Sequence, residues 1–545
     1  MPLTIPLVCG DPAGEEPASF TRFVLPFGYQ LEAGGARGGP AWQVETAAVS
    51  PARQRYFTTE TSRVLFRRAR RFVLQDLDAE HRSFAVPRRD GRGEYRVAIA
   101  TPRLVLFEWR KAQPGAGPHR DDVLATGFLL LDLFFPDAGK APDLDELLEL
   151  NEVFRHCVPP FEDHVRDGPE AGGRRGLATV LGDLPVDLCE AAGPRVRDRR
   201  DGEPLQALYF ERWAALLDRP VEHGGERWRL FPGTWAQRAR SWYHQPLPET
   251  DDGTGWVVYA DSRAFVWTCA LLGDGVDTLR RMLEEPAAHA ADLGHWVKLL
   301  NVDAPGSEPA SATGFERCWA RERTYERWQE QGTAYGFSYH SGALLGPPLT
   351  EPAIWRHFSD LYFDQTLLLL YLRVSSFRFS RRLSEVTECA RGSGGPEQWQ
   401  HDFRALRRDF AFFTNLYQFP LLSNQQQGVE LYALARRHLD VSALFEEIRS
   451  EVESTHAFID MEVAHDHSRT ATRLTVVATA GLLLSVVVGF FGMNILAPDR
   501  ASGLGIRWEL VLFLLGVVVA WAVLASVNLH ATKFDRAFRF WRKQD

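Results

Sequence analysis

Two long uncharged stretches near the end of the chain are its clearest hydrophobic pattern. Residues 474–494 and residues 510–530 contain no Asp, Glu, Lys or Arg. A helix needs about 20 apolar residues to cross the hydrocarbon core of a bilayer. We therefore expect two membrane-spanning helices, joined by an extracytoplasmic loop at 495–509. The alternative is a pair of buried helices in a large soluble core, where uncharged runs of this length are unusual.

The charges that flank these stretches predict an orientation. Arg469 and Arg473 precede the first stretch, and the tail at 531–545 is basic, whereas the loop carries two arginines and two acidic residues. The positive-inside rule then places both termini in the cytoplasm. The N-terminus has no basic segment followed by a long apolar run, so we expect no signal peptide. The predicted location is the cell (inner) membrane, crossed twice.

A long helical stalk is predicted ahead of the first stretch, at 396–473. Apolar residues recur there at helical spacing. They are Val441, Leu444, Ile448, Val452, Ile459 and Val463. Pro420 should interrupt any earlier helix, and Ser423 or Asn424 could cap a new one. A helix continuous from 424 to 491 would have 68 residues and would need partners along its apolar stripe. Self-association into a bundle would supply them.

The first 395 residues alternate strand-like and helix-like patterns, which predicts a mixed α/β cytoplasmic part of the α+β class. We expect two lobes, at 1–170 and 171–395, because breaker residues cluster near the boundary. The predicted strands are 63–66, 95–98, 104–109, 128–135 and 256–259, and the predicted helices are 144–154 and 362–374.

The first uncharged stretch ends in Gly492, Met493 and Asn494. With a long helix before it and a second apolar stretch after it, this Gly-Met-Asn motif resembles that of the CorA family of divalent-cation channels and transporters. The resemblance implies a funnel-shaped homopentamer that conducts divalent cations, above all Mg²⁺, into the cytosol. It also implies that these three residues form the selectivity filter and that membrane lipid is a partner of the spanning helices.

In such a pore, the Asn494 amide could hydrogen-bond the water molecules that surround the ion. Mg²⁺ gives up its water ligands reluctantly, and a ring of neutral amides can hydrogen-bond those waters without binding the ion too tightly to release it. Gly492 would let the helix backbones approach closely. The alternative for Asn494 is an ordinary helix C-cap at a membrane interface.

One face of the first stretch leads back from Asn494. Leu474, Ala478, Leu482 and Ser485 lie on this face and are the predicted pore-lining residues. The alternative is a packing seam of small residues formed by Gly481, Ser485 and Gly489. The chain departs from the family in having Leu483 where many members have proline, and in a loop that is neutral rather than acidic. Zinc, cobalt and nickel therefore stay open as alternative ions.

Acidic and histidine residues gather just before the first stretch. Asp460, Glu462, His465 and Asp466 fall within two turns of a helix. In a symmetric bundle they could concentrate cations at the inner mouth or bind regulatory Mg²⁺, and the histidine makes Zn²⁺ an alternative. A solvated acidic helix face is the other interpretation.

Net charge, cysteine spacing and the motifs that are missing argue against several classes of function. The chain has 545 residues and a formal net charge of −9, which argues against nucleic acid as a partner. Its six cysteines are scattered, which indicates neither a disulfide framework nor a zinc ribbon. Hydrolase and phosphate-loop motifs are missing in convincing context, so we do not expect an enzyme. Besides cation transport, the open alternative is a membrane-anchored signalling or effector protein gated by an unidentified cytosolic ligand.

Overall fold

The structure is a computed structural model, and it describes most of the chain in segments. The described residues are 6–34, 41–47, 49–74, 83–88, 93–109, 125–136, 141–155, 217, 219–230, 263–273, 290–305, 313–349, 354–391, 396–492, 515–516, 518 and 521. They fall into two compact units, Met1–Arg449 and Ser450–Asp545. The first unit is called the body below.

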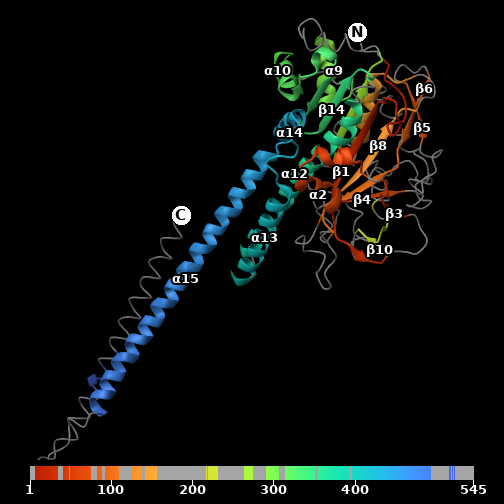
Figure 1. Cartoon of the computed structure of the whole chain (residues 1–545). Coiled ribbons are helices and arrows are strands. Elements are labelled where there is room, and N and C mark those ends of the chain that lie inside the picture. Colours follow the sequence, from red (N-terminus) through yellow and green to blue (C-terminus); the bar gives the residue numbers. More distant parts are fainter. Residues whose placement is uncertain are drawn as a thin grey trace, which may run out of the picture. The chain divides into compact units, whose positions relative to one another are not determined.

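A mixed sheet of fourteen described strands forms the centre of the body (Figure 1). Its order is β12-β13-β14-β11-β1-β8-β7-β4-β3-β9-β10-β2, and β6 pairs with both β8 and β5. The pairs β11–β14 and β3–β9 are parallel, and the other described pairs are antiparallel. The strands are β1 Phe20–Tyr29, β2 Glu32–Ala33, β3 Trp42–Val44, β4 Arg70–Leu74, β5 Ser83–Pro87, β6 Glu94–Ile99, β7 Arg103–Leu106, β8 Ala125–Phe134, β9 Val221–His223, β10 Glu226–Arg229, β11 Phe265–Leu271, β12 Thr324–Tyr325, β13 Ala334–Phe337 and β14 Ser341–Gly346.

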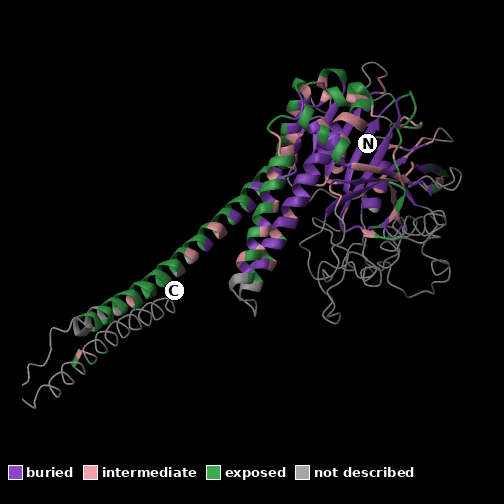
Figure 2. Ribbon diagram, turned by 60° about the horizontal axis from the view of Figure 1, so that its bottom comes forward, coloured by how far each residue is buried: buried purple, intermediate pink, exposed green. Residues whose placement is uncertain are grey.

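Helices precede, cover and follow the sheet. They are α1 Pro51–Tyr56, α2 Thr59–Arg63, the π-helical η1 Val64–Arg68, α3 Leu144–Arg155, α9 Ala290–Asn301, α10 Thr313–Arg323, the 3-10 helix η8 Gln329–Gln331, α11 Ile354–His357, the π-helical η9 Phe358–Tyr362, α12 Phe363–Arg391, α13 Pro396–Tyr417, α14 Gln426–His438 and α15 Val441–Gly492. The long helix α12 is buried over most of its length (Figure 2).

Strand β1 is covered on both faces, and all ten of its residues are buried. Successive side chains of a strand point to opposite faces. Phe23, Leu25 and Phe27 belong to the main core together with residues of α3 and α9. Arg22 faces the other way, where its guanidinium lies over the ring of Phe363 at the start of α12. The central strands are therefore sandwiched between α3 and α9 on one face and α12 on the other.

A widened helical turn, η9, joins α11 to α12 and is anchored to the sheet. Trp267 of β11 stacks on Phe358 with ring centroids 4.0 Å apart, and its indole N–H donates to the Phe358 carbonyl at 3.3 Å. Arg22 donates to the carbonyl of Ser359 at 3.0 Å. A π-helical turn does not follow the regular i to i−4 hydrogen-bond pattern of an α-helix. Two carbonyls of this turn, those of Phe358 and Ser359, accept hydrogen bonds from strands β11 and β1 instead.

The stalk prediction differs from the structure at Asp440. Two helices, α14 and α15, replace the single helix considered from 424 to 491, because Asp440 takes a left-handed conformation with φ of 60°. The residue before α14 is Gln425, whose side chain makes no capping hydrogen bond. Ser423 instead donates its hydroxyl to the carbonyl of Tyr56 at 2.6 Å, and so ties the start of this region to α1.

The prediction of two membrane-spanning helices is wrong. Across the residues that the structure describes, no helix is both long enough and apolar enough to traverse a bilayer. Within the first stretch, Thr475 and Thr479 donate their hydroxyls to carbonyls one turn earlier on α15. The loop at 495–509, the tail at 531–545 and all but four residues of the stretch at 510–530 lie outside the described residues.

Most of the strands and helices predicted for the body are confirmed. The predictions at 95–98, 128–135, 144–154 and 362–374 fall within or nearly on β6, β8, α3 and α12, and that at 104–109 overlaps β7. The strand predicted at 63–66 is wrong, because these residues end α2 and begin η1. The strand at 256–259 and the lobe boundary at 170/171 lie outside the described residues. The mixed α/β character of the body is as predicted.

Gly336 on β13 provides a test of how closely α9 packs on the sheet. A Cβ atom there would lie 2.5 Å from Trp296 Cζ2 and 2.7 Å from Leu300 Cδ2, both on α9. We expect Gly336→Ala to lower the free energy of unfolding by about 1–3 kcal/mol, the usual cost of overpacking. Urea unfolding measures this.

Gly294 on α9 is the matched control, because nothing lies within 4 Å of a Cβ atom built there. We expect Gly294→Ala to raise the stability by up to about 1 kcal/mol, through helix propensity alone. Equal effects of the two substitutions would contradict the close packing of α9 on β13.

Candidate functional site

The distal part of α15 is exposed over most of its described length (Figure 2). Large apolar residues are among those exposed. Leu474 is 65% exposed, Leu482 is 68% exposed, and Ala478 and Ser485 are exposed as well. The four residues predicted to line a pore therefore lie on one continuous helix, where the single chain leaves them uncovered. Val477, Leu484 and Val488 add further exposed apolar surface to the same segment.

The Gly-Met-Asn motif lies at the end of this helix. Gly492 is the last residue of α15, while Met493 and Asn494 lie outside the described residues. The helix thus continues to the motif without interruption, and the prediction that these three residues form a selectivity filter stays a prediction.

The acidic and histidine residues ahead of the apolar segment are all on α15. Asp460 is exposed and pairs with His456 one turn earlier, with 2.7 Å between Oδ2 and Nδ1. His465 is exposed, and Glu462 and Asp466 belong to the same helix. Within the described segments no group of three or more His, Cys, Asp or Glu side chains is arranged to hold a metal ion.

Two buried carboxylates organise the charged interior of the body. Asp364 at the start of α12 is fully buried and accepts from Arg53 Nε at 2.7 Å and from Arg71 at 2.8 Å. Burial alone would raise the pKa of Asp364, but the two guanidinium charges outweigh it and hold the pKa below the ordinary value of 3.8. The carboxylate therefore stays ionised and joins α1, β4 and α12.

Asp132 on β8 repeats this arrangement, on the far side of β7 from β4. Arg22 of β1 binds both of its oxygens at 2.8 Å, and Arg103 of β7 adds a contact at 2.7 Å. Burial opposes ionisation here too, and the charges of Arg103 and Arg22 overcome it, so the pKa of Asp132 is lowered. These two clusters lock the strands and α12 together. Their contacts are those of a structural network, in which each carboxylate is shared by two arginines.

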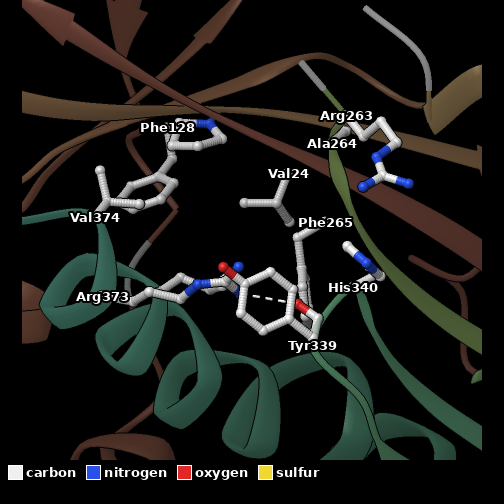
Figure 3. A pocket seen from close by; sticks show the side chains of 11 residues that line it. Val24, Phe128, Arg263, Ala264, Phe265, Tyr339, His340, Arg373 and Val374 are labelled. Carbon is white, nitrogen blue, oxygen red and sulfur yellow. Dashed lines mark hydrogen bonds between the residues drawn. The ribbon is translucent and has the colours of Figure 1, made fainter. Parts of the chain in front are cut away.

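A small cavity lies beside α12, between the sheet and the β13–β14 turn (Figure 3). The guanidinium of Arg373 stacks over the ring of Tyr339, 3.5 Å from its centroid, and donates to the Tyr339 carbonyl at 2.8 Å. His340 and Arg263 line the other side. The cavity volume is about 30 Å³, which accommodates a water molecule and excludes an organic ligand.

A larger opening lies where η1 and β4 approach α13. It has a volume of about 470 Å³, within the range of small-molecule sites, and we call it the arginine–aromatic groove. Arg67, Arg68 and Arg70 line one side of it, and Phe412 and Leu416 of α13 line the other. A second opening, of about 910 Å³, shares Arg67 and Arg70 with it.

Sequence reasoning missed this groove, although a signal was present. The run Arg67-Arg68-Ala69-Arg70-Arg71 places four arginines within five residues. The aromatic side of the groove comes from residues more than 300 positions further along the chain, which no local pattern connects to that run.

Comparisons with known proteins leave the chain without an assigned relative. No protein-family model, no curated protein and no solved structure matches it.

Proposed function

We propose that this chain transports divalent metal cations, Mg²⁺ foremost, across the cell membrane into the cytosol. The observation that carries the proposal is the exposed apolar surface of distal α15, which leads directly into Gly492, Met493 and Asn494. The motif is the one that resembles the CorA family. The exposed distal segment would contact lipid and further copies of the chain.

The exposed apolar surface requires a partner. Contiguous apolar patches on a monomer mark sites of contact with other proteins or with lipid. Five large aliphatic side chains between Leu474 and Val488 are each 48–68% exposed, on a segment that carries no charge. Copies of α15 packed about a common axis, five of them if the family resemblance holds, would cover part of this surface, and lipid would cover the rest.

Charge also favours a cation as cargo. The region from Asn424 to Arg473 contains nine Asp and Glu but only five Arg, so it is acidic where it approaches the apolar segment. Repetition of these charges around an axis would concentrate cations there. A membrane potential of 100 mV, negative inside, then favours entry of a divalent ion by about 4.6 kcal/mol, so no nucleotide-driven step is required.

Asn494→Ala tests the role assigned to the motif. We expect it to reduce Mg²⁺ flux into proteoliposomes by about tenfold or more, because each subunit loses an amide that holds the water shell of the ion, a contact worth about 1 kcal/mol per copy. Fluorescent Mg²⁺ indicators trapped inside the vesicles measure the initial rate.

Asn424→Ala is the matched control, since Asn424 is an exposed amide in the α13–α14 linker. Mg²⁺ flux through the Asn424→Ala variant should equal that through the unaltered chain. If Asn494→Ala transports as fast as this control, the motif is no filter and the proposal fails. A parallel series with Zn²⁺, Co²⁺ and Ni²⁺ identifies the preferred ion.

A further inference from the structure

The arginine–aromatic groove combines exposed arginines with the exposed ring of Phe412. Arg67 and Arg68 are exposed, and neither forms an ion pair or a hydrogen bond with any residue that the structure describes. Two arginines adjacent in sequence repel each other unless an anion lies between them or solvent screens them. The side of the groove formed by η1 is therefore suited to bind an anionic group.

The two acidic residues of the groove are already neutralised. Glu108 accepts from Arg378 at 3.1 Å and from the Tyr371 hydroxyl at 2.7 Å. Asp409 accepts from Arg382 at 2.8 Å. Because each carboxylate is held by an arginine of α12, neither is available to neutralise Arg67 or Arg68. The net charge that a ligand meets in the groove is positive.

The opposite side of the groove is apolar and partly aromatic. The buried stripe of α13 runs through Trp399, Phe403, Leu406, Phe410, Phe413 and Tyr417. Phe412 and Leu416 lie off this stripe, one turn apart on the helix, and are 58% and 37% exposed. An anion alone would leave these side chains in water, so a ligand that fills the groove must also carry an apolar, ring-like part.

A planar cation–aromatic stack forms the third element of the groove. The guanidinium of Arg70 lies 4.4 Å from the ring centroid of Trp109, and Arg70 also hydrogen-bonds His223. Burial, together with the charge of Arg70, lowers the pKa of His223, so its ring stays neutral and can accept this bond. The stack holds Arg70 and Trp109 in fixed positions at the wall of the groove, where Phe72 packs on the indole as well.

We infer that the arginine–aromatic groove binds a nucleoside polyphosphate, with its phosphates on Arg67 and Arg68 and its base against Phe412. Guanidinium groups bind phosphate oxygens through charge-assisted, often bidentate hydrogen bonds. The groove volume of about 470 Å³ suits a ligand of this size. The inference does not depend on cation transport, because every residue that carries it lies in the body.

Isothermal titration of the full-length chain with adenosine triphosphate tests the inference. We expect the double substitution R67A/R68A to weaken binding by about tenfold or more, because two charge-assisted contacts are lost. Phe412→Ala should weaken binding of adenosine triphosphate several-fold and leave that of inorganic tripolyphosphate unchanged. Arg321→Ala and Phe315→Ala on α10 are matched exposed controls and should bind as the unaltered chain does.

Three outcomes would overturn the inference. The first is absence of binding at millimolar adenosine triphosphate, and the second is equal affinity of R67A/R68A and the unaltered chain. The third is tripolyphosphate binding as tightly as the nucleotide, which would show that the aromatic side contributes nothing. Circular dichroism spectra that match the unaltered chain would show that the variants are folded.

Discussion

Replacing Asp364 with alanine is expected to lower the free energy of unfolding of the body by about 3–5 kcal/mol. Removal of this fully buried carboxylate leaves the largely buried Arg71 without its partner and leaves Arg53 with only the half-exposed Asp360. The cost comes mainly from the loss of the charge that compensates these buried guanidinium groups, more than from the lost hydrogen bonds. Urea unfolding followed by tryptophan fluorescence measures it.

Asp360 is the matched control for this substitution. It pairs with the same Arg53 at 3.2 Å, but its side chain is 44% exposed. An exposed pair contributes about 0–1 kcal/mol, so Asp360→Ala should be nearly neutral. If the two alanine variants proved equally stable, the central role of Asp364 in joining α1, β4 and α12 would be contradicted.

The same carboxylate predicts an acid dependence. Because the pKa of Asp364 is lower in the folded chain than its ordinary value of 3.8, its ionisation stabilises the fold above that value. This contribution is lost as the pH falls below about 4 toward the folded pKa. Asp364→Asn should therefore lose less stability than the unaltered chain between pH 5 and pH 3.

Trp267→Ala is expected to cost about 3–5 kcal/mol, the range for removal of a large buried aromatic side chain. Trp267 is completely buried, stacks on Phe358, and meets Phe363 edge-on with centroids 5.7 Å apart. Its loss leaves a cavity between β11 and η9, and also removes the donor to the Phe358 carbonyl. Urea unfolding again measures the change.

Phe315 on α10 is the control for loss of an aromatic ring, since its side chain is 62% exposed. Phe315→Ala should change the stability by less than about 0.5 kcal/mol. A loss of stability in Trp267→Ala no greater than in Phe315→Ala would show that η9 does not depend on the indole.

The spacing of apolar residues predicted many strands and helices of the body, because in these segments that spacing determines the secondary structure. Strand β8 and helices α3 and α12 are long and strongly apolar on the side that faces the core, and each lies where its periodicity predicted. The failure at Arg63–Phe66 shows the limit of that approach. Its β-branched and aromatic residues suit a strand, yet the chain continues the helical turn that begins with α2.

The sites of the body could not be predicted, because they join residues that are distant in sequence. Asp364 meets Arg53 and Arg71 across 311 and 293 positions, and the residues of the arginine–aromatic groove are separated just as widely. The prediction of two membrane-spanning helices was made from two long apolar stretches, and the described helices do not bear it out. The helix that ends at Gly492 could be predicted from the local pattern of residues alone, and the structure contains this helix as α15.

Uptake of Mg²⁺ into proteoliposomes tests the central claim most directly. Vesicles that contain the full-length chain are compared with protein-free vesicles under a potential of 100 mV, negative inside. The account predicts faster uptake into the protein-containing vesicles, and a further increase with the size of the potential, because the field favours entry of a divalent cation. Equal uptake by the two kinds of vesicle, for Mg²⁺ and for Zn²⁺, Co²⁺ and Ni²⁺ alike, would contradict it.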